Sequence, residues 1–163
     1  MGLLKKILRH LLEIAICSIL IVLTTVVFSQ VVSRYFLHVS LSWSEELARF
    51  LLMWLAMLSA AYAFRTKSHF ALRIVVERFP DHMRRGTSIA VLLVVTLFFL
   101  LILYQSIIYV HGVSGHKAPA MQIPMEIPYS SIIVGSALIV WESAKATLRE
   151  LMQWNSANKL SDS

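Results

Sequence analysis

Three charged side chains stand at the edge of an apolar part of this sequence. Glu45, Glu46 and Arg49 lie within the stretch SLSWSEELARFLLMW, after which an uncharged run follows. Because ionised groups are costly inside a bilayer, groups at this place are expected to have polar partners. Ser42 and Glu45 have the spacing of a helix capping box, which predicts a helix that begins near Trp43. Glu45 and Arg49 are four residues apart, so we expect them to pair along that helix.

Glu13 is another carboxylate beside an apolar run, and it suggests an alternative function. A small four-helix exporter acting as a homodimer uses a glutamate of its first helix as a proton site, and Glu13 would take that role. Glu13 lies within one turn of Arg9 and His10, however, which favours a position at the membrane edge. The six histidines flank the apolar runs instead of facing one another inside them. The sequence therefore predicts no haem, no metal site, no catalytic residue and no enzyme.

Composition indicates that the chain lies in a membrane. Its residues are 58% hydrophobic and 15% charged, whereas soluble domains are about 45–50% apolar and about 25% charged. Four uncharged runs carry the excess: residues 14–33, 50–64, 86–110 and 127–141. A bilayer core takes roughly 20 apolar helical residues, and flanking residues extend the two shorter runs to that length. We predict an all-α integral membrane fold with four transmembrane helices, at about 12–33, 44–64, 86–110 and 127–146.

These helices are expected to form a single membrane domain, residues 1–155, followed by a flexible polar tail at 156–163. Residues 70–79 have an amphipathic pattern, which predicts a short helix that lies in the membrane interface and ends at Pro80. A plain extension of the second transmembrane helix is the alternative. The loop HGVSGHKAPAMQIPMEIPYS is rich in glycine and proline but also in methionine and isoleucine. We expect this loop to fold back on protein or lipid.

The basic residues predict an orientation. Lysine and arginine concentrate in cytoplasmic loops, and 12 of the 15 lie in the N-terminal tail, the second loop and the C-terminal tail. The first and third loops hold the other three, Arg34, Arg49 and Lys117. Both termini are therefore predicted to be cytoplasmic. The net charge of +6 is explained by this topology, and no nucleic-acid partner is expected.

The second transmembrane helix has a face suited to contact with another helix. Ala56, Ala60 and Ala63 recur on the face that begins with Glu45 and Arg49, and small residues allow a second helix to approach closely in lipid. An enzyme or a pump should show ionisable groups deep in its spans, and none stands there in this sequence. The pattern favours a subunit that supports another membrane protein.

The stretch SRYFLHVSLSWSEELARFLLMWLAMLSAAYAFRTKSHF resembles the small membrane subunit of TRAP transporters, the DctQ-type family. Such subunits show an arginine–aromatic pair after the first span, then a tryptophan, a Glu-Glu-x-x-Arg group, a second tryptophan and a histidine after a basic turn. The matching positions are Arg34, Tyr35, Trp43, Glu45, Glu46, Arg49, Trp54 and His69. The segment PAMQIP, from Pro119, and Tyr129 at the start of the fourth span also match.

The resemblance implies a role and partners. In TRAP systems a large membrane subunit holds the substrate and sodium sites, and a periplasmic substrate-binding protein delivers the solute. The small subunit is thought to enlarge the fixed scaffold. The resemblance thus implies a scaffold subunit in the bacterial inner membrane, in contact with both proteins and with membrane lipids. The transported solutes would be organic acids such as C4-dicarboxylates or sialic acid, and this chain would bind no cofactor of its own.

The resemblance also implies where the contacts lie. The subunit interface would use the matched positions and the small-residue face: Arg34, Trp43, Glu45, Glu46, Arg49, Trp54, Ala56, Ala60, Ala63 and His69. Docking of the binding protein on the outer side would use His116, Lys117 and Glu126.

Topology reporters test the predicted orientation. Reporters at either terminus and at Arg78 should give a cytoplasmic signal, and reporters at His38 and Lys117 an external one, because the basic residues divide in this way. Paired fusions to a fluorescent protein and to a periplasm-active phosphatase measure the two sides. A cytoplasmic signal at Lys117 would contradict the arrangement of four spans.

Overall fold

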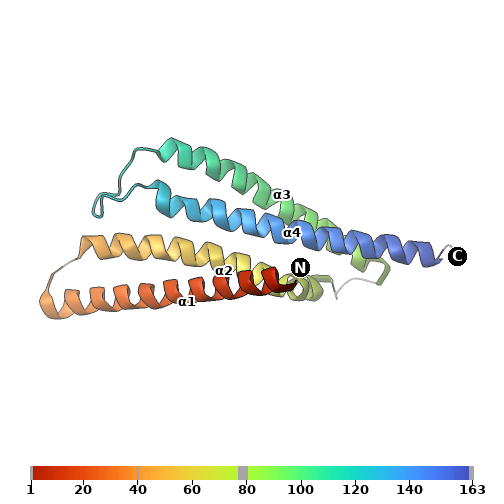
Figure 1. The fold of residues 1–163 in the computed structure, drawn as a ribbon, viewed down its shortest axis with the longest axis horizontal. Helices are drawn as coiled ribbons and strands as arrows, with labels where there is room; N and C mark the ends of the chain where they lie inside the picture. Colours follow the sequence, from red (N-terminus) through yellow and green to blue (C-terminus); the bar gives the residue numbers. More distant parts are fainter. Residues whose placement is uncertain (1, 40, 77–80, 162–163) are drawn as a thin grey trace.

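Helices make up nearly all of the structure, a computed structural model that describes residues 2–39, 41–76 and 81–161. Within these residues there is no strand. The elements in chain order are α1 (Gly2–Val32), the π-helical turn η1 (Ser33–Leu37), α2 (Ser42–Val76), α3 (Asp81–Val113) and α4 (Glu126–Ser161) (Figure 1).

Each long helix contains a segment that is long and apolar enough to cross a membrane. Within the described residues these segments are His10–Phe36, Ser42–Thr66, Gly86–Val113 and Glu126–Met152. The prediction of an all-α membrane protein with four such helices is confirmed. The helices are longer than the uncharged runs because helical backbone continues into the polar flanks, where long side chains can reach the interface.

The four helices lie in a row, in the order α1, α2, α4, α3 (Figure 1). α4 packs along both α2 and α3, whereas α2 and α3 touch only slightly. In the described part of the chain α1 packs on α2 and η1 and makes no contact with α3 or α4. The molecule is therefore an open row of helices, with α2 and α4 inside it and α1 and α3 at its edges.

Small side chains hold the centre of the row together. On α4 the buried positions recur at helical spacing and are mostly small: Ser131, Gly135, Ser136, Ile139, Ser143, Ala146 and Thr147. Their hydroxyls donate to carbonyl oxygens one turn earlier, as Ser136 Oγ does to Ile132 O at 2.6 Å. Thr96 Oγ1 of α3 also donates to Ser143 Oγ at 3.0 Å. Small polar residues thus allow close packing while their hydroxyls remain hydrogen-bonded.

Gly135 marks a very close approach of α4 to α2. A Cβ added at this position would lie 2.7 Å from Met57 Cβ and 3.2 Å from the Met57 carbonyl oxygen. These two atoms move only with the backbone of α2, so a larger residue would force the helices apart. Glycine is required here by the packing of two helices.

Two predictions concern the ends of the helices. α2 continues without a break to Val76, so residues 70–76 extend α2, as in the alternative of a plain extension. The expected end at Pro80 lies outside the described residues, and a position in the membrane interface stays a prediction. α4 runs to Ser161, so helical backbone covers most of the segment 156–163. The flexibility of that tail also stays a prediction.

Replacing Gly135 by alanine should destabilise the fold by about 1–3 kcal/mol, because an added methyl in a tight contact forces the backbones apart. Gly112→Ala is the matched control, since Gly112 is also helical and nothing lies within 4 Å of its added Cβ. That change should leave stability unchanged or raise it by up to about 1 kcal/mol, through helix propensity. Unfolding followed by circular dichroism in detergent measures both. Equal effects of the two changes would contradict the close approach.

Candidate functional site

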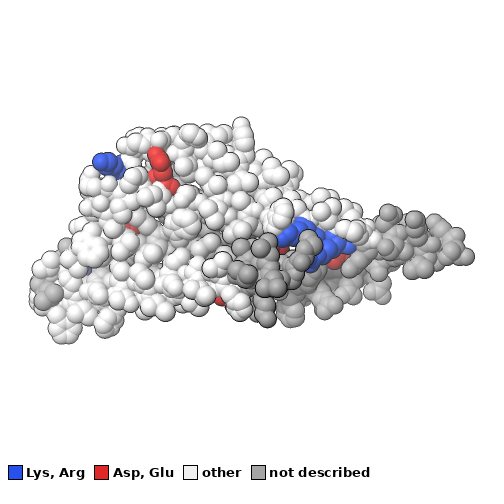
Figure 2. Space-filling view, viewed as in Figure 1, with Lys and Arg blue, Asp and Glu red and all other residues white. Residues whose placement is uncertain are grey.

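Most of the predicted charged contact residues lie at one end of the row. η1, the start of α2, the loop between α3 and α4 and the start of α4 meet there, and the two chain termini point toward the other end (Figure 1). We name the end where the loops meet the loop end, and the end toward which the chain termini point the terminal end. Charged side chains appear near both ends of the face in Figure 2, and the surface between them is mostly uncharged. This distribution suits a protein whose middle lies in hydrocarbon.

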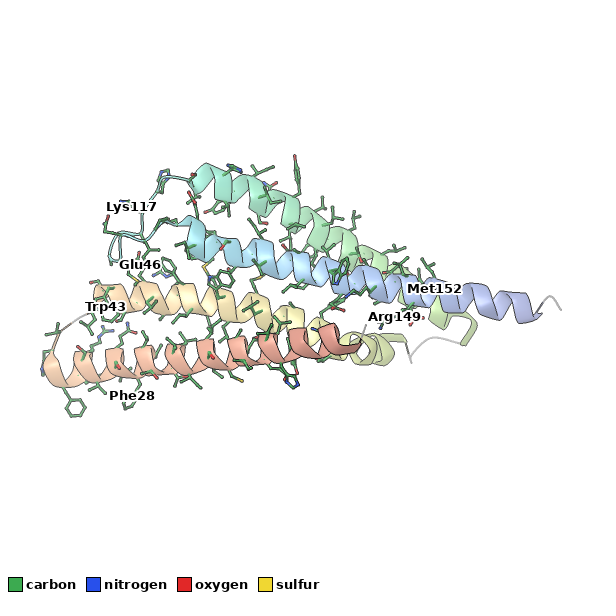
Figure 3. The ribbon with its side chains drawn as sticks, in the orientation of Figure 1. Phe28, Trp43, Glu46, Lys117, Arg149 and Met152 are labelled. Carbon is green, nitrogen blue, oxygen red and sulfur yellow. The ribbon has the colours of Figure 1, made fainter. Side chains whose placement is uncertain are left out.

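Glu46 holds the α3–α4 loop, residues 114–125, against α2. Its Oε2 accepts hydrogen bonds from the backbone N–H groups of Ala120 at 3.1 Å and Met121 at 2.7 Å. Successive backbone N–H groups in a turn form a small anion-binding site, and hydrogen bonds to a carboxylate are stronger than neutral ones. Figure 3 shows Glu46 between α2 and the loop that carries Lys117. Within this chain, therefore, Glu46 has two strong partners.

The α3–α4 loop is itself a compact hairpin. The Ala118 N–H donates to Ile123 O and the Gln122 N–H donates to Ala118 O, both at 2.9 Å. The Met125 N–H donates to His116 O at 3.0 Å. Gln122 has a φ of 57°, in the left-handed region, which lets the turn close. Ala118 is fully buried, so the prediction that this loop folds back on the protein is confirmed.

Glu45 and Arg49 are both exposed at the loop end. Together with Ser42, Glu46, Pro119 and Ala120 they line an open depression of about 450 Å³. The structure has no ion pair between Glu45 and Arg49, although it describes both side chains, so the predicted pair is wrong. An exposed pair contributes little free energy.

The capping box predicted at the start of α2 does not form. α2 begins at Ser42, so this residue lies in the first turn instead of preceding it. Within the described residues, neither Ser42 nor Glu45 makes a side-chain hydrogen bond to the backbone. Ser44 Oγ donates instead to Leu41 O at 2.7 Å. The predicted start near Trp43 is nevertheless within one residue of the observed one.

One side of α2 is open along its length. Five exposed residues on it are Glu45, Arg49, Ala56, Ala60 and Ala63, which we name the open stripe. Leu52 lies on the same side and is also exposed. Leu58 and Ala61, on the opposite side of the helix, are buried. Contacts within the chain therefore use the other faces of α2 and leave the alanines of the open stripe uncovered.

The other predicted contact residues are spread over the loop end and beyond. Arg34 of η1 and Trp43 of α2 are exposed, and Trp54 is half-buried lower on α2. His116 and Lys117 are exposed on the α3–α4 loop, and Glu126 is half-buried in the first turn of α4. The side chain of His69 lies outside the described residues. The structure thus brings the predicted residues to one end, apart from the alanines, Trp54 and His69.

Glu13 lies at the terminal end, where it links α1 to α2. The Tyr62 hydroxyl donates to Glu13 Oε1 at 2.7 Å, and His10 Nδ1 lies 3.5 Å from Glu13 Oε2. α1 touches no other long helix among the described residues, so this polar contact and the packing along α2 hold it in place. The spacing of residues along the chain did not indicate the bond with Tyr62.

A second polar contact at the terminal end links α2 to α4. Glu142 Oε1 lies 3.9 Å from Arg65 Nε and 3.2 Å from Lys145 Nζ. The Lys145 ammonium also lies 4.6 Å from the centre of the Trp141 ring, a favourable cation–π distance. All three charged side chains are partly shielded from solvent. The side chains that the structure describes form no cluster of three or more groups suited to hold a metal ion.

Comparison with known proteins gives a consistent set of relatives. The family model described as tripartite ATP-independent periplasmic transporters, DctQ component, matches residues 23–153. A TRAP transporter small permease protein of Haemophilus influenzae is 28% identical over 128 residues, which cover 78% of this chain and 80% of that protein.

Two further relatives carry the name of a solute. The C4-dicarboxylate TRAP transporter small permease protein DctQ of Rhodobacter capsulatus is 27% identical over 115 residues, covering 62% of this chain and 45% of that protein. The sialic acid TRAP transporter permease protein SiaT of Haemophilus influenzae is 31% identical over 78 residues. That match covers 48% of this chain but only 13% of the relative, which is a much longer protein.

Proposed function

The chain belongs to the DctQ component family of tripartite ATP-independent periplasmic (TRAP) transporters, and from this we propose that it is the scaffold subunit of a sodium-coupled importer of organic acids. It is an inner-membrane component of a transporter, and its family supports a transport role over an enzymatic one. In this proposal it stabilises a large transport subunit that binds sodium and the solute and receives that solute from a periplasmic binding protein. The names of two relatives support C4-dicarboxylates or sialic acid as the solute.

The main support for a scaffold role is the open stripe on α2. α2 lies inside the row, with α1 on one side and α4 on the other, yet Ala56, Ala60 and Ala63 remain exposed. Lipid tails gain little from contact with an alanine, whereas a second helix gains close van der Waals contact with its backbone. A helix of the large subunit is therefore the occupant we propose for this stripe.

Charge at the loop end supports the same interface. Glu45 and Arg49 begin the open stripe, and neither has an ion-pair partner within the described chain. At the edge of the hydrocarbon such groups are stabilised by opposite charges on a neighbouring protein. We place Arg34, Trp43 and Trp54 at the margin of this interface, and His69 belongs to the same proposal from its match to the family pattern.

The length of one relative agrees with a large membrane partner. In SiaT the region similar to this chain is a small part of a single long permease protein. A segment that is covalently joined to a larger permease in one protein and separate in another is expected to pack against that permease in both. His116, Lys117 and Glu126 lie at the loop end, where we propose that the binding protein docks.

Arg49→Ala should weaken association with the large subunit more than it weakens the fold of this chain. Within the chain Arg49 is exposed and forms no ion pair. At a buried subunit boundary its loss would leave opposite charges unpaired, which costs about 3–5 kcal/mol at full burial. Arg49→Lys should restore only part of the association, because an ammonium cannot reproduce a bidentate guanidinium contact. Co-purification of the two subunits in mild detergent, with helicity recorded alongside, measures both effects.

Arg149→Ala is the control for that experiment. Arg149 is also exposed but lies toward the terminal end on α4, so its removal should leave co-purification unchanged. If the complex survives Arg49→Ala as well, the interface is limited to the alanines of the open stripe and Arg49 contacts only lipid headgroups.

Glu13→Gln should leave uptake by the assembled transporter within about twofold of the wild type. The glutamine keeps a carbonyl oxygen that can accept a hydrogen bond from the Tyr62 hydroxyl. A scaffold subunit also has no need of a group that binds and releases a proton at this position. Uptake of radiolabelled solute, normalised to the amount of complex, is the measurement. Loss of transport in a normally assembled complex would favour the alternative function of a proton-coupled exporter.

A further inference from the structure

We propose that Glu46 is a positioning residue, whose carboxylate fastens the α3–α4 loop to α2 so that His116 and Lys117 are presented to the binding protein in one fixed arrangement. This rests on the proposed function, because a docking partner is part of that function. The fastening itself is a property of this chain alone and can be measured without any partner.

The contact is a long-range one and is concentrated on a single atom. Ala120 and Met121 are 74 and 75 residues from Glu46 in the sequence, and both N–H groups reach its Oε2. Among the described residues these are the hydrogen bonds that join the loop to α2. A charged acceptor with two backbone donors holds a loop more firmly than neutral contacts do. Removal of this carboxylate therefore releases the turn from α2.

The hairpin transmits this fastening to the exposed residues of the loop. Lys117 pairs with Pro124 as an antiparallel bridge. The hydrogen bonds from Ala118 N–H to Ile123 O and from Met125 N–H to His116 O lie on either side of it. Gln122 Nε2 also donates to Pro119 O at 3.2 Å, which closes the turn from its other side. Because the hairpin is linked in this way, it moves as one piece, and the position of its turn sets the position of Lys117.

The chemistry of the loop indicates what it would meet. The Glu46 carboxylate is directed at the N–H groups of the turn, whereas the side chains of His116 and Lys117 are exposed. The exposed residues therefore offer an ammonium group and an imidazole. Of the carboxylates at the loop end, that of Glu46 is engaged by the backbone, which leaves those of Glu45 and Glu126. Such a surface fits an acidic patch on a protein partner, and fixing its geometry lowers the entropy lost on docking.

Hydrogen–deuterium exchange tests the fastening on the full chain in lipid nanodiscs. Glu46→Ala should speed exchange of the amides of Ala120 and Met121 by about tenfold or more, because hydrogen bonds to charged groups protect strongly. Glu46→Gln, which keeps an acceptor oxygen, should give a smaller increase. Glu45→Ala removes the same charge from a side chain that makes no hydrogen bond to the loop, so it should leave this exchange unchanged. Unchanged exchange in Glu46→Ala would overturn the proposal.

Uptake by proteoliposomes that contain the complete transporter tests the consequence. In Glu46→Ala the concentration of binding protein at half-maximal uptake should rise at least about threefold, with little change in the maximal rate, because only docking is altered. Glu46→Gln should recover part of that loss. Faster loop exchange without a change in half-saturation would overturn the docking role. If wild-type complex gives no uptake that depends on binding protein, the proposed function fails, whereas the exchange result on the nanodisc-embedded chain still stands.

Discussion

The close packing of α4 against α2 and α3 is the constraint on which the rest of the structure depends. In a bilayer, burial of apolar surface between helices yields little, because lipid tails are as apolar as leucine side chains. Helices must gain instead from close contact, and the small buried residues of α4 supply it. Gly135 shows how tight this contact is, since even a methyl group would collide with Met57 Cβ of α2. α4 thereby becomes the centre of the row, although it is the last helix in the chain.

This arrangement determines which surfaces remain for partners. With α4 on one side of α2 and α1 on the other, the open stripe is among the parts of α2 that the described chain does not cover. Large apolar residues face outward on α1 and α3, among them Phe28, Val94 and Phe98, and these suit lipid. The edges of the row thus expose mainly large apolar residues, whereas the open stripe exposes three alanines. The scaffold role that we propose requires both a lipid-facing edge and a surface that a second protein can approach.

The sequence predicts the spans well and the contacts between them less well, for a physical reason. A bilayer requires long apolar runs and places charges at their ends, so both can be read from composition along the chain. The order of the helices depends on which pairs of small-residue faces pack together. A small residue such as Ser136 or Ala60 shows that its face can pack closely, but it does not identify the helix that packs there. The bond between Glu46 and the loop joins residues 74 positions apart, and no periodic pattern records it. The expected pair of Glu45 and Arg49 failed because helical spacing permits a contact without making it favourable at an exposed site. The family resemblance singled out the charged group as a unit, but it did not indicate that Glu46 is hydrogen-bonded to the loop of its own chain.

The two ends of the polypeptide lie toward the same end of the row (Figure 1), as an even number of membrane crossings requires. A gene fusion that added a second membrane protein after Ser163 would start it on the side where this chain began. Such a fusion would need no extra crossing to preserve the topology of either part. α4 stays helical as far as Ser161, so the connection to the fused protein would begin as a continuation of this helix. The architecture is therefore compatible with a separate subunit and with one segment of a longer permease. Its relatives include both a protein of similar length and a much longer one.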